Sequence, residues 1–155
     1  MAVVNLVKSI YTSTDVTALG EIASGDTVVI PSGSTGTNLA LTTPTLTNPI
    51  VTNYVETLYS ANTGTAITVD LANGTVQKLT LTGNATITMP TAVAGKSFVI
   101  MLKQDATGNR SVTWSTVAWP SATAPTITGT ANKMDMYSFF SDGTSWYGVT
   151  VSQNY

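Results

Sequence analysis

Alternating apolar and polar positions recur along the chain from about residue 53 onward. In residues 76–82, Leu79 and Leu81 alternate with Lys78 and Thr80, which is the period of two that a half-buried β-strand requires. Comparable patterns predict strands at residues 54–59, 66–71, 76–82, 85–89, 97–104, 111–119, 135–141 and 145–151. Turn residues separate these short strands at regular spacing, which is typical of a sandwich. We therefore predict an all-β fold, with an antiparallel, jelly-roll-like β-sandwich over residues 53–155.

Two segments of this region carry stronger local signals. Residues 98–102 read Phe-Val-Ile-Met-Leu and are apolar on both faces. This pattern predicts a central strand that is covered on each side. Asp142-Gly143 lies between two runs rich in aromatic residues, and an Asp-Gly pair in that position is a strong hairpin signal. We expect the last two strands to form a hairpin there.

The residues before the sandwich form two further segments. Residues 1–38 contain two expected strands, 3–11 and 27–31, and are interpreted as an extended attachment arm. Residues 39–52 carry no charge, and the prolines at 44 and 49 push the residues before them into extended conformations. An extended segment cannot bury its own apolar side chains. It is therefore a strand on the domain's surface, a stem shared with identical neighbours, or a plain linker. The candidate stem residues are Leu39, Leu41, Pro44, Leu46, Pro49, Ile50 and Val51.

The composition removes several kinds of functional site. The chain has 155 residues, enough for one domain with a short appendage. It contains 0 Cys and 0 His, which excludes Cys/His zinc sites, Ser-His-Asp triads, cysteine nucleophiles and disulfide scaffolds. A net charge of −2 provides no attraction for a polyanion, so we expect no nucleic-acid partner. No segment is long and apolar enough to cross a membrane, and the first residues do not resemble a signal peptide.

The low charge also bears on how the surface is used. Only 9% of the residues are charged, while 43% are hydrophobic. Such a surface repels neighbouring molecules weakly, so we expect other chains to cover part of it. The absence of cysteine fits folding in a reducing cytoplasm.

Carboxylates are the only catalytic groups that the chain has in number. Asp70, Asp105, Asp135 and Asp142 are candidates for the acid and base of a glycosidase. Each of the last three also has a simpler interpretation, because Asp105 and Asp142 lie in turn sequences and Asp135 lies two residues from Lys133. The loop after Asp105 lacks the carboxylate spacing of a calcium loop. We therefore predict no catalytic residue, no metal ligand and no cofactor.

Aromatic residues in the last third of the chain form the other candidate site. Exposed tryptophan and tyrosine rings stack on sugar rings, whereas buried ones fill a sandwich core. Both interpretations apply to Trp114, Trp119, Tyr137, Trp146 and Tyr147. We take Trp119, Trp146 and Tyr147 as the candidates for contact with a host-surface glycan.

Several separated motifs occur in a fixed order between residues 67 and 148. The first is Ile-Thr-Val-Asp-Leu-Ala-Asn-Gly-Thr-Val-Gln-Lys-Leu-Thr-Leu-Thr-Gly-Asn-Ala-Thr-Ile-Thr-Met-Pro at residues 67–90. Gly-Lys-Ser-Phe at 95–98, Leu-Lys-Gln-Asp-Ala-Thr-Gly at 102–108 and Val-Thr-Trp at 112–114 follow, and Phe-Phe-Ser-Asp-Gly-Thr-Ser-Trp-Tyr-Gly at 139–148 is the last. Together they resemble the carboxy-terminal β-domain of tailed-bacteriophage structural proteins. Thr-Pro-Thr-Leu-Thr-Asn-Pro at residues 43–49 resembles the connecting stems of phage fibres.

The resemblance implies a non-enzymatic, homo-oligomeric virion component, usually a trimer. A threefold axis at the stem would let three copies bury its apolar residues together. Since the sequence has no long shaft, a capsid decoration (cement) protein is preferred over a short tail fibre, an adaptor or a glycan-binding module. The expected partners are the major capsid protein or another virion protein, identical copies, and a host-surface glycan; the expected location is the virion surface, after folding in the bacterial cytoplasm. The residues expected to attach to the shell are Val3, Val4, Leu6, Val7, Ile10 and Tyr11.

Overall fold

The computed structural model describes residues 48–155, in which residues Val51–Tyr155 belong to one compact unit. The predictions made for residues 1–47, including the attachment arm and its two strands, lie outside the described residues. The described elements are the strands β1 (Leu58–Asn62), β2 (Ala66–Thr68), β3 (Val76–Leu81), β4 (Ala85–Thr88), β5 (Ser97–Gln104), β6 (Val112–Ser115), β7 (Val117–Ala118), β8 (Met134–Ser141) and β9 (Trp146–Ser152), with the single-turn 3-10 helices η1 (Leu71–Asn73) and η2 (Pro120–Ala122).

The all-β sandwich prediction is confirmed, and most of the strands lie where the alternation places them. Residues 97–104 form β5 as expected, and β3 and β4 each end one residue early. The strand expected at 111–119 is instead two short strands, β6 and β7. Thr116 separates them with a φ of 62°, a left-handed conformation that an extended strand cannot contain.

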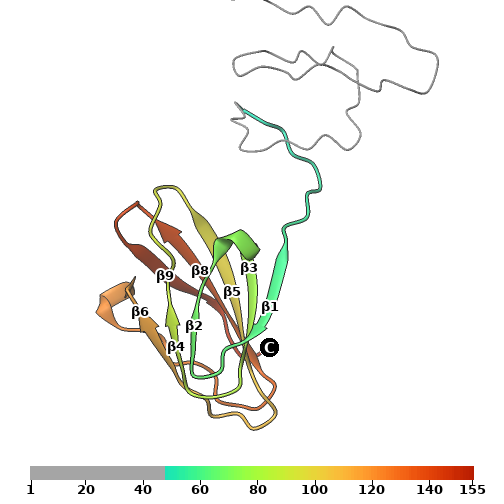
Figure 1. Cartoon of the computed structure of the whole chain (residues 1–155), viewed down its shortest axis with the longest axis vertical. Helices are drawn as coiled ribbons and strands as arrows, with labels where there is room; N and C mark the ends of the chain where they lie inside the picture. The colour runs from blue at the N-terminus through green and yellow to red at the C-terminus, as the bar shows by residue number, and fades with distance from the viewer. Residues whose placement is uncertain (1–47) are drawn as a thin grey trace, which may run out of the picture. The chain divides into compact units, whose positions relative to one another are not determined.

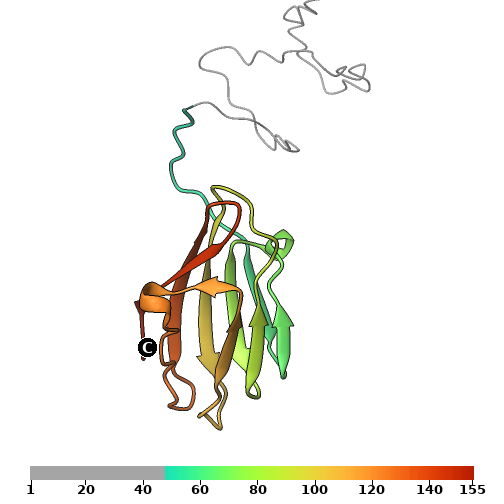
Figure 2. The same ribbon diagram turned by 90° about the vertical axis from the view of Figure 1, so that its left-hand side faces the viewer.

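The chain passes back and forth between two sheets (Figures 1 and 2). The large sheet has the order β1-β3-β5-β8-β9-β7, and the small sheet has the order β2-β4-β6. Every connection from β1 to β7 crosses to the other sheet, so successive strands of one sheet run in the same direction. Accordingly β1, β3 and β5 are parallel neighbours, as are β2, β4 and β6. The predicted antiparallel, jelly-roll-like pairing is therefore wrong for these strands. Among the strands described, the antiparallel pairs are β5–β8 and β8–β9.

Apolar side chains from both sheets meet between the two layers. Leu79 and Leu81 point inward, as predicted, and Ile87 of the small sheet faces them; all three are 0% exposed. At one end of the core the Phe98 ring stacks on that of Phe139, with the centroids 4.9 Å apart. Burying each such side chain contributes about 1.5–3 kcal/mol, so this inner layer holds the two sheets together.

Strand β5 is central in the large sheet but is covered on one face only. It lies between β3 and β8, and its inward side chains Phe98, Ile100 and Leu102 are buried by the small sheet. Val99 and Met101 point to the other face and remain partly exposed. The prediction of a central strand is confirmed, whereas its second face has no covering layer among residues 48–155.

Candidate interaction surface

Asp142 closes the hairpin between β8 and β9, as the sequence predicts. Its carboxylate accepts hydrogen bonds from the backbone N–H groups of Ser145 and Thr144, each at 2.8 Å, and from the Tyr147 hydroxyl at 2.9 Å. These hydrogen bonds, that from Ser145 foremost, hold the pKa of Asp142 below its usual value. The hydrogen bond to the carboxylate in turn raises the pKa of Tyr147. The carboxylate thus fixes the turn and one exposed aromatic ring.

Asp70 and Asp105 also organise the backbone next to them. Asp70 caps η1 by accepting a hydrogen bond from the Ala72 N–H at 2.9 Å. Asp105, in the loop after β5, forms an ion pair with Arg110 at 3.0 Å and accepts a bond from the Gly108 N–H at 2.9 Å. The Arg110 hydrogen bond, followed by the one from Gly108, lowers the pKa of Asp105. Both carboxylates therefore have structural partners.

Asp135 lies on the inner face of β8 and is 2% exposed. Its Oδ2 accepts hydrogen bonds from the Thr128 N–H at 2.7 Å, the Tyr137 hydroxyl at 3.1 Å and the Gln153 side-chain amide at 3.2 Å. Its Oδ1 accepts one from the Asn154 N–H at 3.0 Å. This carboxylate ties the end of the chain to the segment before β8.

The surroundings of Asp135 set its charge state. Burial favours the neutral acid, but the hydrogen bonds from Thr128 and Asn154 outweigh burial and lower the pKa of Asp135. Burial, together with the adjacent carboxylate, raises the pKa of Tyr137, so this phenol stays protonated. Asp135 does not pair with Lys133, as the sequence suggests it could. The salt bridge found in the described part of the chain joins Asp105 and Arg110 instead.

The four carboxylates have separate hydrogen-bond partners. Each serves its own loop or helix end, and no hydrogen bond in residues 48–155 joins one of these carboxyl groups to another. Within the same residues, no group of three or more Asp, Glu, His or Cys side chains is placed to hold a metal ion. Each of these four carboxylates is therefore held by structural partners of its own.

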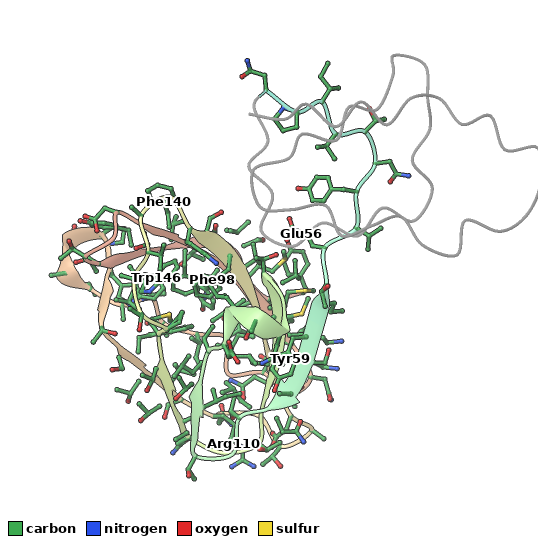
Figure 3. The ribbon with its side chains drawn as sticks, turned by 45° about the horizontal axis from the view of Figure 1, so that its top comes forward. Glu56, Tyr59, Phe98, Arg110, Phe140 and Trp146 are labelled. Carbon is green, nitrogen blue, oxygen red and sulfur yellow. The ribbon has the colours of Figure 1, made fainter. Side chains whose placement is uncertain are left out.

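The three aromatic residues considered for glycan contact have different environments. Trp146 is 2% exposed, donates its indole N–H to the Pro90 carbonyl at 2.8 Å and lies against Phe98 (Figure 3). Trp119 packs edge-on against Trp114, with the ring centroids 5.4 Å apart. Trp146 is therefore buried in the core, whereas Trp119 is partly buried against it. Tyr147 is 47% exposed and is the most exposed of the three.

The outer face of the large sheet carries a row of four aliphatic side chains and one serine. The register places Leu58, Val76, Val99, Ser138 and Val149 side by side across β1, β3, β5, β8 and β9. Four of these five side chains are aliphatic, and those at the two ends of the row, on β1 and β9, are 54% and 52% exposed. One uncharged row thus spans five hydrogen-bonded strands on the side away from the small sheet.

A second row extends the apolar surface toward the carboxyl ends of β3 and β5. Met101 and Met136 are neighbours in register on β5 and β8, and Lys78 precedes them on β3. We call Leu58, Val76, Val99, Val149, Met101 and Met136 the outer apolar band. This band was not predicted from the sequence, because its residues become neighbours only once the partner of each strand is known. The apolar pattern on both faces of residues 98–102 was the signal that pointed to it.

Charged groups lie beside the outer apolar band rather than within its first row. Lys103 lies one row beyond Met101, toward the carboxyl end of β5. At the opposite end, Glu56 accepts a hydrogen bond from the Thr75 hydroxyl at 2.6 Å and borders a shallow hollow (Figure 3). The band therefore lies between two charged ends of the face, a lysine end at Lys103 and a carboxylate end at Glu56.

A comparison with protein-family models identifies the chain. The model described as "Putative phage tail fibre C-terminal domain" matches residues 43–146, about two thirds of the sequence. The chain belongs to this family. It is thus a phage structural protein of the tail-fibre type and a virion component. No curated protein and no solved structure matches the chain.

The tail-fibre match covers the sandwich as far as the start of β9, together with most of the predicted stem. Of the candidate stem residues, Pro49, Ile50 and Val51 are described, and Ile50 and Val51 are 96% and 60% exposed. Leu39, Leu41, Pro44 and Leu46 lie outside the described residues, as do the shell-attachment candidates between Val3 and Tyr11. No helix in the described part of this tail-fibre-type protein is long and apolar enough to span a membrane.

Proposed function

We propose that this chain is a non-enzymatic, homotrimeric structural protein that forms the outward end of a phage attachment fibre and works by contact alone. The tail-fibre family match over residues 43–146 is the observation that carries the proposal. The placement of the carboxylates agrees with it, because each of those considered as catalytic is engaged in a separate structural role.

The trimer rests on the stem. Ile50 is 96% exposed in the isolated chain, and Val51 and Val55 are also exposed. A run of apolar side chains with no covering layer is stabilised when identical neighbours bury it around a common axis. The remaining stem candidates extend the same uncharged segment toward residue 39.

Decoration of the capsid, preferred from the sequence alone, is the alternative location. It depends on attachment of residues 3–11 to the major capsid protein. The copy number per purified particle, measured by quantitative mass spectrometry against the major capsid protein, separates the two locations. A tail or vertex fibre gives a few to a few tens of copies, whereas a decoration protein is present on the order of hundreds, in fixed ratio to the shell lattice. The higher number would refute the fibre proposal.

Host-glycan contact is proposed at Tyr147. This ring is 47% exposed and is held by the Asp142 carboxylate, so it offers a pre-oriented face for stacking on a sugar. A glycan array probed with the full chain tests the contact. Binding that is lost in Tyr147→Ala but kept in Val93→Ala, a change at an exposed residue of the β4–β5 loop, supports it. Binding that is equal in both variants refutes it.

A further inference from the structure

The outer apolar band differs from scattered surface apolar residues because it is continuous. Its first row runs in register across five strands, from Leu58 on the edge strand β1 to Val149 on β9. Isolated exposed apolar residues are normal on soluble proteins, whereas a contiguous patch marks a surface that another molecule covers. The band therefore requires a covering partner.

The sequence of β5 also indicates that the outer face is covered. Strands that are apolar on both faces are found where both faces are buried. β5 has this composition and lies at the centre of the large sheet, but the small sheet covers only the side of Phe98, Ile100 and Leu102. Val99 and Met101 carry the pattern to the uncovered side. A second layer over this side would complete the environment that the sequence of β5 favours.

The size of the face suits a protein partner. Five strands spaced about 4.8 Å apart, with the two same-face rows of the band about 6.7 Å apart, give an apolar centre of roughly 300 Å². A standard interface buries about 800 Å² per partner, with an apolar centre and a polar rim. The band would form the centre, and the lysine and carboxylate ends would form the rim.

The charges select the kind of partner. The first row has no charged side chain, and Lys78 and Lys103 lie toward one end of the face while Glu56 lies at the other. A polyanionic partner would need a cationic cluster in the middle of the face. Identical copies of this chain bring equally neutral first rows, so these rows can pack together around the common axis of the proposed trimer, with Lys78 and Lys103 toward one end and Glu56 toward the other.

We propose that the outer apolar band is the surface through which the sandwich contacts a second copy of this chain. The contact deepens the proposed function, since it rests on the homo-oligomer proposed there and assigns the sandwich surface that the oligomer buries. It is separate from the stem, so each surface can be disrupted on its own.

The first test uses the mass of the full chain in solution, measured by light scattering after gel filtration over a range of concentrations. Val99→Glu and Val149→Glu each place a charge on the first row; Val93→Glu, at a 49% exposed residue of the β4–β5 loop, is the matched control. We expect each band variant to weaken association at least about tenfold and the control to leave it unchanged. A monomeric wild type, or band variants that associate like the control, would overturn the proposal. Near-ultraviolet circular dichroism of the packed Trp146 checks that each variant is folded.

The second test does not depend on how well the sandwich tolerates a new charge. The chain has 0 Cys, so one introduced cysteine reports one position. Ser138→Cys places a thiol of nearly the same size in the middle of the first row, whereas Ser111→Cys places one at an exposed residue beside the small sheet. Cross-linking with a short bis-maleimide should join copies of Ser138→Cys and leave Ser111→Cys single. Equal cross-linking of the two variants, or none at Ser138→Cys, would overturn the proposal, while the particle copy number tests the proposed function independently.

Discussion

Replacing Asp135 with asparagine tests whether the buried carboxylate anchors the end of the chain. Asparagine has the same shape, but it offers one acceptor oxygen and one donor NH₂ where the carboxylate offers two acceptors. If its oxygen takes the place of Oδ2, the bonds from Thr128, Tyr137 and Gln153 are kept, and the NH₂ then faces the Asn154 N–H. If the amide is flipped, three hydrogen bonds are lost instead of one.

The loss can be worked out from the better of these two orientations. One hydrogen bond to a charged acceptor disappears, and the three that remain go to a neutral amide oxygen instead of a carboxylate, which together cost about 2–3 kcal/mol. Because domains of this size are stable by only about 5–15 kcal/mol, the variant remains folded but is clearly weakened. With a urea m-value of about 1–2 kcal/mol/M, the unfolding midpoint falls by about 1–2 M. Tryptophan fluorescence follows the transition, since Trp146 is 2% exposed in the native state.

The pH dependence gives a second readout with a defined sign. The folded state lowers the pKa of Asp135, so the carboxylate contributes stability above its unfolded pKa of about 3.9 and loses that contribution as the pH falls through the folded value. The difference between wild type and Asp135→Asn should therefore be complete at pH 7 and shrink below about pH 4. Equal midpoints at pH 7, or a difference that stays constant on acidification, would refute the reasoning.

Three further changes test other contacts by thermal unfolding of the full chain. Gly74→Ala should prevent stable folding or lower Tm by more than 10 °C, roughly, because Gly74 has a φ of 134° and its new Cβ would collide with the Thr57 carbonyl; an unchanged Tm would contradict this. Gln104→Leu should cost about 2–4 kcal/mol by leaving three backbone groups without their side-chain partner, and a neutral result would show that water replaces the amide. Trp146→Phe should cost about 1–2 kcal/mol through the lost Pro90 hydrogen bond and ring volume, and a stabilised variant would exclude this account.

The positions of the strands could be predicted from the sequence because alternation is a local property. Leu79 and Leu81 point inward wherever β3 is placed, and residues 97–104 form a strand in any sheet. Partner and direction are not local properties. A connection that crosses to the other sheet makes neighbouring strands parallel, whereas one that turns back within a sheet makes them antiparallel. Both use similar short turns, so the sequence does not distinguish them. The antiparallel prediction failed at this step, whereas the Asp142-Gly143 hairpin, which stays within one sheet, was predicted correctly.

The dependence on strand pairing also explains why the environments of the candidate residues were not predicted. Asp135 lies two residues from Lys133 in sequence, but strand alternation turns its side chain into the core, where hydrogen bonds replace the expected ion pair. Trp119 and Trp146 lie in the part of the chain richest in aromatic residues, and their burial depends on which strands face each other across the two layers. The outer apolar band depends on five strands in register, so the two-sided apolar pattern of residues 98–102 was its one local signal.

The place where the stem joins the sandwich has a mechanical consequence. The chain enters the large sheet at Leu58, in the edge strand β1, which has a single neighbour, β3. Tension transmitted along the stem therefore reaches this one ladder before the inner strands, and it loads the Glu56–Thr75 hydrogen bond on the way. If the fibre proposed above carries load along the stem, β1 is the part of the sandwich that would yield first, because an edge strand is held by a single ladder. The remaining strands, with the aromatic core between the layers, are shielded from the load until β1 has separated.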